Sequence, residues 1–268
     1  MARHARVDAE LVRRGLARSR QQAAELIDAG RVRIDGIPAA KAATAVPTTA
    51  SLVVQGESQD RWVSRGAHKL LGALAAFGPQ GLSVEGRRCL DAGASTGGFT
   101  EVLLRSGARE VVAADVGYGQ LAWSLQSDDR VTVIDRTNVR TLTPELIGGR
   151  AELIVADLSF ISLGLVLDAL IACATPDADI VPMVKPQFEV GKELVGAGGV
   201  VRDQQLRADA VISVARRAQT HGWYTAGVTA SPLPGPSGNV EYFLWLRATE
   251  SGVDIESAVT EAVAKGPQ

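Results

Sequence analysis

The sequence is poor in the residues that cross-link a domain or bind metal. Its 268 residues include two cysteines, Cys89 and Cys173, and three histidines, His4, His68 and His221. Two cysteines cannot form a disulfide framework, and so few ligands predict no metal site. Both cysteines lie in apolar runs, so we expect buried thiols in a reducing cytoplasm.

Long apolar runs are also missing. The most apolar stretch, 158–167, is ten residues long and is bounded by acids, whereas a membrane-spanning helix needs about 20 residues. The first fourteen residues carry charges throughout and contain no apolar core of a secretory signal. These absences predict a cytoplasmic protein with no membrane partner.

The chain has no overall excess of positive charge, because 28 Lys and Arg face 30 Asp and Glu. The balance hides an asymmetry: residues 1–41 carry a net charge of +4 and the remainder carries −6. A small basic segment on an acidic body predicts electrostatic capture of a partner by that segment. A solvated helix face, balanced by nearby acids, is the alternative. The candidate contact residues are Arg6, Arg14, Arg18, Arg20, Arg31 and Arg33.

The basic segment predicts a small α+β domain that ends near residue 59. Apolar residues at helical spacing predict a helix over 7–15. A capping box at Ser19 begins a second helix that ends at Gly30. Alternation followed by Asp-Gly over 31–37 predicts a hairpin, and 52–54 predicts one more strand. We expect a linker at 60–64 and a second domain over 65–268.

The second domain alternates strands with helices, which is typical of a parallel sheet covered on both faces. Strands are predicted at 88–91, 110–115, 131–134, 152–156 and 179–184, and helices at 97–106, 119–126, 161–172 and 203–220. Runs at 223–230 and 240–247 predict a terminal pair of strands, and the Gly-rich segment 189–201 predicts a mobile loop.

A glycine-rich turn follows the first of these strands, in LDAGASTGGF at 90–99. Its glycines allow a close approach of the backbone to a ligand beside a helix N-terminus. The dinucleotide pattern is not met, since Ser95 replaces its second glycine, which disfavours a pyrophosphate. Asp115 ends the next strand, where a carboxylate binds a ribose diol. Asp135 and Asn138 are placed either to contact an adenine or to form a turn.

Longer motifs make the chain recognisable. SRGAHKL at 64–70, ADLSFIS at 156–162, VKPQFEVGK at 184–192 and PGPSGNVEYFLWL at 234–246, together with the glycine-rich turn, resemble the TlyA family of FtsJ-like methyltransferases. The basic segment resembles the RNA-binding domain named after small-subunit ribosomal protein four. The resemblance covers essentially the whole chain and implies a Rossmann-like, S-adenosylmethionine-dependent methyltransferase domain with a mostly parallel seven-stranded sheet. Its implied cofactor residues are Asp91, Gly93, Ser95, Thr96, Gly97, Gly98, Phe99, Asp115, Asp135, Asn138 and Asp157.

The resemblance also implies the reaction. Members of the family methylate the ribose 2′-oxygen of cytidines in 16S and 23S ribosomal RNA, in the small and large ribosomal subunits, and affect susceptibility to the tuberactinomycins capreomycin and viomycin. A Lys-Asp-Lys-Glu tetrad implies catalytic roles for Lys69, Asp157, Lys185 and Glu241. A membrane-active haemolysin, named by the family's other title, and a small-molecule methyltransferase are the alternatives.

The chemistry of the reaction suits these four residues. A ribose hydroxyl is a poor nucleophile, so aligning it and stabilising its developing charge are the main tasks of the protein. We expect Lys185 closest to the oxygen, between Asp157 and Glu241, either removing the proton or only stabilising the charge. Read alone, Asp157 fits a helix N-cap and Lys185 a solvated loop lysine. Glu241 in an apolar strand needs a partner.

Overall fold

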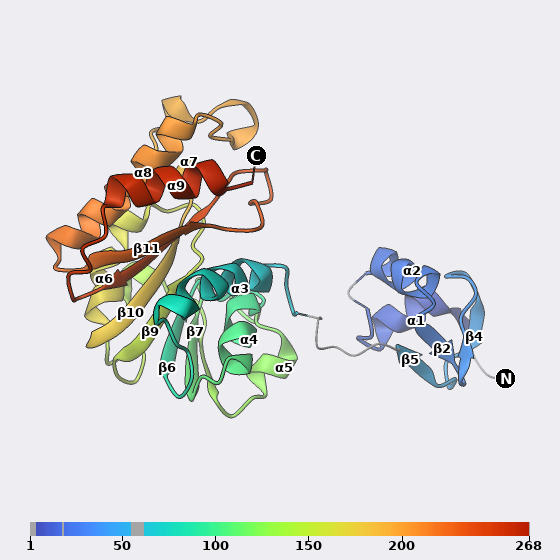
Figure 1. Ribbon diagram of the computed structural model, residues 1–268. Helices are drawn as coiled ribbons and strands as arrows, with labels where there is room; N and C mark the ends of the chain where they lie inside the picture. The colour runs from blue at the N-terminus through green and yellow to red at the C-terminus, as the bar shows by residue number, and fades with distance from the viewer. Residues whose placement is uncertain (1–3, 18, 55–61, 268) are drawn as a thin grey trace. The chain divides into compact units, whose positions relative to one another are not determined.

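Figure 1 shows the chain as a computed structural model, which describes residues 4–17, 19–54 and 62–267. The chain divides into two compact units, Met1–Arg61 and Trp62–Gln268, and each is described by itself. The predicted end of the first domain at residue 59, and the first two residues of the predicted linker at 60–64, lie outside the described residues.

The first unit, which we call the head, combines two helices with short antiparallel strands. Its elements in the described residues are β1 (His4–Arg6), α1 (Val7–Arg13), α2 (Arg20–Asp28), β2 (Val32–Ile34), β3 (Ile37–Pro38), β4 (Ala45–Pro47) and β5 (Leu52–Val54). Strands β3, β2 and β5 form one sheet, and β1 pairs with β4 in another. The β1–β4 pair was not predicted, because it joins two short segments that are distant in the sequence.

Local signals in the head act as the sequence predicts. The Ser19 hydroxyl accepts a hydrogen bond from the Gln22 amide at 3.2 Å and caps α2. Asp35 and Gly36 have φ angles of 48° and 86°, which is the conformation of a tight turn between β2 and β3. Apolar residues of both helices and of β2 pack into one small core, with Leu11 and Val32 fully buried.

The second unit is built on a seven-stranded sheet in the order β11-β12-β10-β9-β6-β7-β8. The strands are β6 (Arg88–Ala92), β7 (Glu110–Ala114), β8 (Val131–Ile134), β9 (Ala151–Ala156), β10 (Ala174–Val184), β11 (Tyr224–Ala230) and β12 (Tyr242–Arg247). Strands β6 to β10 are parallel, and β12 runs antiparallel to both neighbours. The predicted α/β class with a mostly parallel sheet is confirmed.

Helices cover both faces of this sheet, as Figure 1 shows. The helices are α3 (Gly66–Phe77), α4 (Gly98–Arg105), α5 (Trp123–Gln126), α6 (Leu167–Ala172), α7 (Pro186–Glu189), α8 (Gln204–Thr220) and α9 (Ile255–Lys265). Leu153 and Val155 of β9 pack in the core with α3 and α4, whereas Ile154 packs in the core with α6, α8 and α9. Successive side chains point to opposite faces of a strand, so both faces need apolar residues.

Several elements differ from the sequence prediction. Strand β10 begins at Ala174, with a shift of register before Asp179, so the apolar run marks only its second part. The predicted helix over 119–126 shortens to α5, and that over 161–172 divides into a 3-10 turn at 163–165 and α6. The segment 189–201, which was predicted as a mobile loop, contains two 3-10 turns and an isolated bridge between Gly196 and Val200.

The strand directions bring the functional candidates to one edge of the sheet. Gly93, Asp115, Asp157 and Lys185 follow β6, β7, β9 and β10, and the carboxyl ends of parallel strands share an edge. Strand β12 is reversed, so its beginning lies at that same edge, where Tyr242 pairs with Val184. Glu241, which precedes β12, thereby reaches the same place. No helix in the described part of the chain is long and apolar enough to cross a membrane.

Candidate active site

The glycine-rich turn packs directly on the end of β9. Gly93 has a φ of 88°, and a Cβ there would lie 2.7 Å from the Asp157 carbonyl oxygen. A side chain at this position is therefore excluded both by backbone conformation and by contact. Ser95 has a φ of 48°, a left-handed conformation that is costly for a residue other than glycine. This conformation turns its amide toward Asp115.

Asp115 joins the first turn to the loop after β7. One carboxylate oxygen accepts from the Ser95 amide at 2.8 Å, and the other accepts from the Gly117 amide at 2.6 Å. Asp135 accepts from the Gly119 amide at 2.9 Å, and Asn138 accepts from the Arg140 amide at 3.1 Å. Asp135 and Asn138 thus both hold turns in the structure.

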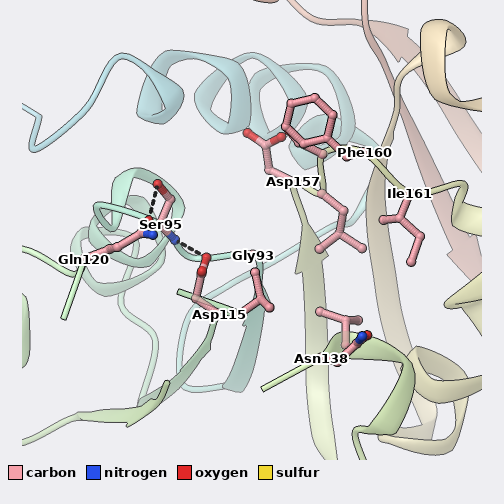
Figure 2. A pocket seen from close by; sticks show the side chains of 12 residues that line it. Gly93, Ser95, Asp115, Gln120, Asn138, Asp157, Phe160 and Ile161 are labelled. Carbon is pink, nitrogen blue, oxygen red and sulfur yellow. Dashed lines mark hydrogen bonds between the residues drawn. The ribbon is translucent and has the colours of Figure 1, made fainter. Parts of the chain in front are cut away.

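A cavity of about 470 Å³ opens between these turns and the segment after β9 (Figure 2). Its lining combines backbone of the glycine-rich turn, carboxylates and apolar side chains, in the manner of small-molecule sites. The lining residues are Gly93, Ser95, Asp115, Val116, Gln120, Asn138, Val139, Asp157, Leu158, Ser159, Phe160 and Ile161. We call it the first cavity.

A second cavity, of about 300 Å³, adjoins the first. The two share Gly93, Ser95, Asp157 and Ser159 as common walls. The other lining residues are Ser64, Arg65, Gly66, Lys69, Ala94, Thr96, Gly98, Phe99, Lys185 and Pro236. Asp157 therefore divides a site with an acidic first part and a second part that contains both lysines.

Lys185 and Asp157 form one of two ion pairs at the second cavity. Lys185 Nζ lies 2.6 Å from Asp157 Oδ1 and donates a hydrogen bond to Ser159 Oγ at 3.0 Å. The side chain of Lys185 is 8% exposed and that of Asp157 is 22% exposed. An ammonium enclosed in this way keeps a fixed position, because both of its partners belong to the segment after β9.

The second ion pair joins Lys69 of α3 to Glu241. Lys69 Nζ lies 2.5 Å from Glu241 Oε2, and both side chains are almost fully buried. Lys69 Nζ also contacts Met183 Sδ at 4.0 Å, two residues before Lys185 on β10. The expectation that Lys185 lies between two carboxylates is corrected here, because Glu241 pairs with Lys69. The reversed strand β12 brings Glu241 to this edge. Which lysine Glu241 binds depends on the packing of α3, which the sequence does not specify.

The structure places three predicted cofactor residues outside the linings of both cavities: Asp91, Gly97 and Asp135. Asp91 is fully buried, accepts from Thr100 Oγ1 at 2.7 Å, and has a pKa raised to about 7, chiefly because burial disfavours its charged form. Gly97 has a φ of 97°, a left-handed conformation that favours glycine, and a Cβ there would also lie 2.2 Å from a Leu125 methyl.

Sequence reasoning missed several lining residues, notably Ser159 and Phe160. Phe160 is 90% exposed, has a φ of 64° and stacks near Phe188, with ring centroids 5.3 Å apart. Both missed residues stand in the ADLSFIS motif beside Asp157, so their position in that motif was the available signal. Ser64 and Arg65 stand likewise in the SRGAHKL motif.

The predicted contact arginines of the head differ in their exposure and in the hydrogen bonds that they make within the head. Arg14 is partly buried and donates to the carbonyl oxygens of Ala50 at 2.7 Å and Thr48 at 2.8 Å, so it ties that turn to α1. Arg33 donates to the Gly36 carbonyl at 2.9 Å. The remaining four are placed as follows: Arg6 and Arg20 are exposed and share Asp8, Arg31 is partly buried, and Arg18 lies outside the described residues.

The fold and the site define a methyltransferase. Residues 62–248 match the FtsJ-like methyltransferase family, and residues 5–50 match the S4 domain. Across the full length of both chains, the sequence is 70% identical to the 16S/23S rRNA (cytidine-2′-O)-methyltransferase TlyA of Mycobacterium tuberculosis. It is also 36% identical to Hemolysin A of Brachyspira hyodysenteriae, over 88% of this chain and 97% of that protein.

A solved structure agrees with these matches. A hemolysin-named protein from Streptococcus thermophilus superposes with a TM-score of 0.72 at 37% identity, and the match covers 99% of this chain and 96% of that one. The chain belongs to the TlyA family of FtsJ-like methyltransferases. The predicted family and the class of enzyme are confirmed.

Proposed function

We propose that this enzyme methylates the ribose 2′-oxygen of cytidine in 16S and 23S ribosomal RNA, with S-adenosylmethionine as the methyl donor. The single observation that carries the proposal is that two buried lysines, each in an ion pair with a carboxylate, line one small cavity beside the glycine-rich turn. The substrate follows from the relative in Mycobacterium tuberculosis, whose name states this reaction and which is 70% identical over the full chain.

The residues around the first cavity fit the donor. The turn at Gly93 lets a ligand approach backbone without a side chain in the way, and Asp115 offers carboxylate oxygens for a ribose diol. Asn138 and Val116 line the part where an adenine would lie. Bound S-adenosylmethionine supplies an electrophilic methyl group on a positively charged sulfur. Carboxylates at Asp115 and Asp157 suit that charge.

In the second cavity the protein acts on the hydroxyl. We assign to Lys185 the position against the reacting 2′-oxygen, where it either takes the hydroxyl proton itself or, as an ammonium, stabilises the negative charge that develops while water takes the proton. Asp157 and Ser159 bind Lys185 Nζ, so the side chain is in place before the reaction. Lys69 lines the same cavity and is paired with Glu241, which does not line it. We assign both to positioning, because Lys69 Nζ also contacts Met183, two residues before Lys185.

The head supplies the affinity for RNA in this proposal. Its match to the S4 domain and its exposed arginines suit phosphate contacts, which dominate recognition of structured RNA. The finer biological expectation, altered susceptibility to capreomycin and viomycin, belongs to the same proposal. A strain lacking the gene and a strain restored with the Lys185→Ala form should then differ equally from wild type in growth inhibition.

Mass spectrometry of nucleosides tests the proposed reaction. Ribosomal RNA from cells lacking the enzyme is incubated with the protein and S-adenosylmethionine, digested, and compared with a sample that lacks the donor. The expected product is 2′-O-methylcytidine in both RNAs. Methylation of another nucleoside, or of small molecules alone, would overturn the assignment of the substrate.

A further inference from the structure

Helix α1 of the head contains two buried carboxylates, which use their arginines differently. Glu10 is 1% exposed and binds Arg13 and Arg14, and Arg14 is bound in turn to backbone carbonyls of residues 48 and 50. Through Arg14 that cluster ties α1 to the turn at 48–50, whereas Arg13, which is 62% exposed, bonds to Glu10 within α1. Asp8 is 4% exposed and binds Arg6 and Arg20, whose side chains are 50% and 59% exposed.

The geometry at Asp8 joins two elements that are distant in sequence. Arg6 precedes α1 and donates from Nε to Asp8 Oδ1 at 3.0 Å and from Nη2 to Oδ2 at 2.8 Å. Arg20 begins α2 and donates from Nη2 to the same Oδ2 at 3.1 Å. The Ala9 amide donates to Oδ1 at 2.7 Å and fixes the carboxylate itself. Two guanidinium groups are thus held on one oxygen.

The charges of this cluster favour an anion in solvent. One carboxylate between two guanidinium groups leaves a net charge of +1 at the surface. Hydrogen bonds from Arg6, and then from Arg20, hold the pKa of Asp8 down to about 2 against the effect of burial, so the carboxylate stays ionised at neutral pH. Among the described contacts, Asp8 uses two of the five N–H donors of Arg6 and one of those of Arg20.

Free arginine side chains lose rotamer freedom when they bind, and this loss of entropy weakens binding. A carboxylate that fixes two of them beforehand lowers this cost. A phosphodiester group carries one negative charge shared by two oxygens, and these oxygens match adjacent guanidinium donors. Asp8 is therefore buried and hydrogen-bonded to both Arg6 and Arg20, and the exposed guanidinium groups of these two arginines form the contact surface.

We propose that Asp8 is a positioning residue for RNA: it holds Arg6 and Arg20 side by side as a two-arginine clamp for one phosphodiester group. The inference rests on the proposed function, in which the head binds ribosomal RNA. It has a counterintuitive consequence. Removing this negative charge makes the head more basic, yet RNA affinity should fall, because the clamp loses its order.

The test compares Asp8→Asn with Asp28→Asn in the full-length protein. Asp28 is exposed on α2, so its replacement raises the charge of the head by the same amount without touching the clamp. Binding of purified 23S ribosomal RNA is measured by filter retention at fixed salt. We expect Asp8→Asn to weaken binding roughly tenfold, from the restored freedom of two arginines, and Asp28→Asn to leave it within about twofold or tighter.

A double-mutant comparison separates positioning from general damage to the head. In an Arg6→Ala/Arg20→Ala background, adding Asp8→Asn should change RNA affinity by less than about twofold, because the residues it positions are gone. Hydrogen exchange over residues 7–17 reports whether the head remains folded. If Asp8→Asn unfolds the head, Asp8→Glu is measured instead, because this variant keeps the charge and moves the carboxylate. We expect Asp8→Glu to lower RNA affinity roughly threefold.

The outcomes distinguish the two ideas. The positioning role is wrong if Arg6→Ala/Arg20→Ala binds RNA weakly while the Asp8 variant binds as tightly as wild type. The Asp8 variant is Asp8→Asn, or Asp8→Glu if Asp8→Asn unfolds the head. In that case the proposal that the head binds RNA is unaffected. If Arg6→Ala/Arg20→Ala binds like wild type, the arginines do not contact RNA, and both the clamp and that part of the proposed function are wrong. Equal further loss from Asp8→Asn with and without the arginines also contradicts the clamp.

Discussion

The head and the sheet edge of the second unit both contain ion pairs between carboxylates and cations, but the two regions differ in how far the cations are exposed. In the head the acids are buried and the cations exposed: Asp8 is 4% exposed, whereas Arg6 and Arg20 are half exposed. At the sheet edge the cations are enclosed, since Lys69 and Lys185 are 5% and 6% exposed. Each lysine has one carboxylate partner.

The difference indicates which partner each region can accept. Exposed guanidinium groups act on a polyanion of any shape, and salt screens the attraction. Enclosed ammonium groups act only on a group that enters their cavity, where low dielectric strengthens the interaction. In the function we propose, the head captures the RNA and the second unit performs the chemistry, and each prediction below changes one side of this division.

The largest effect is expected at Lys185. Lys185→Ala should reduce the rate of methyl transfer by more than about 10³, a loss confined to the transition state, since the enclosed ammonium is removed. Binding of RNA and of S-adenosylhomocysteine should remain near wild type in titration calorimetry. Full activity of this variant would remove Lys185 from the mechanism.

Lys185→Arg sharpens the same comparison. Arginine keeps a positive charge but cannot give up its proton at neutral pH. An active Arg variant restricts Lys185 to stabilising charge, whereas an inactive one that still binds both ligands agrees with proton removal.

The second ion pair should be structural as well as functional. Glu241→Gln leaves Lys69 buried without its charged partner and should lower the free energy of unfolding of the second unit by about 3–5 kcal/mol. All four tryptophans lie between residues 62 and 245, so fluorescence during urea unfolding follows this unit alone. Adding Lys69→Met should restore part of the loss. Equal stability of Glu241→Gln and wild type would contradict the buried pair.

Stability should also depend on pH through Asp91. Its pKa is about 7 in the folded state, against an ordinary value of 3.8. Between these values the folded state keeps a proton that the unfolded state has lost, so the free energy of unfolding falls as pH rises from about 4 to about 7 and then levels. Asp91→Asn should remove this contribution, on the order of a few kcal/mol. The prediction is wrong if the difference in free energy of unfolding between wild type and Asp91→Asn is the same at about pH 5 and about pH 8.

Removal of the head should separate capture from the cofactor site. A chain that begins at Trp62 retains the core of the second unit and should bind S-adenosylhomocysteine normally, while its affinity for ribosomal RNA falls about a hundredfold or more. Its activity on ribosomal subunits should fall accordingly. Methylation at the full-length rate would show that the head does not guide the substrate.

The smallest effect concerns the donor site. Asp115→Ala should weaken binding of S-adenosylhomocysteine by about 1–3 kcal/mol, because ribose hydroxyls lose an acceptor and the Ser95 amide loses its partner. NAD should not bind to either form. Calorimetry with both ligands checks this, and binding of NAD in place of the donor product would reverse the assignment.

The order of elements was predictable where local chemistry decides it. The Ser19 cap, the Asp35-Gly36 turn and the apolar runs of β6, β7 and β9 are encoded within a few residues. The β1–β4 pair and the start of β10 at Ala174 depend on tertiary contacts and left no local signal.

The candidate site was predictable in its membership more than in its pairing. Strand ends predict that Asp157 and Lys185 lie at one edge, and family motifs add Lys69 and Glu241. The partner of Glu241 depends on where α3 packs, which no spacing in the sequence specifies. Ser159 illustrates the same limit, since its bond to Lys185 follows from the path of a loop.

Alkaline hydrolysis of labelled RNA tests the central claim most directly. The protein transfers a radioactive methyl group from S-adenosylmethionine to 23S ribosomal RNA, and the RNA is then hydrolysed completely in alkali. Cleavage in alkali requires a free 2′-hydroxyl, so a 2′-O-methyl group protects the linkage beside it. The account predicts that the label appears in alkali-resistant dinucleotides with cytidine at the methylated position. Label in mononucleotides would place the methyl group on a base and contradict it.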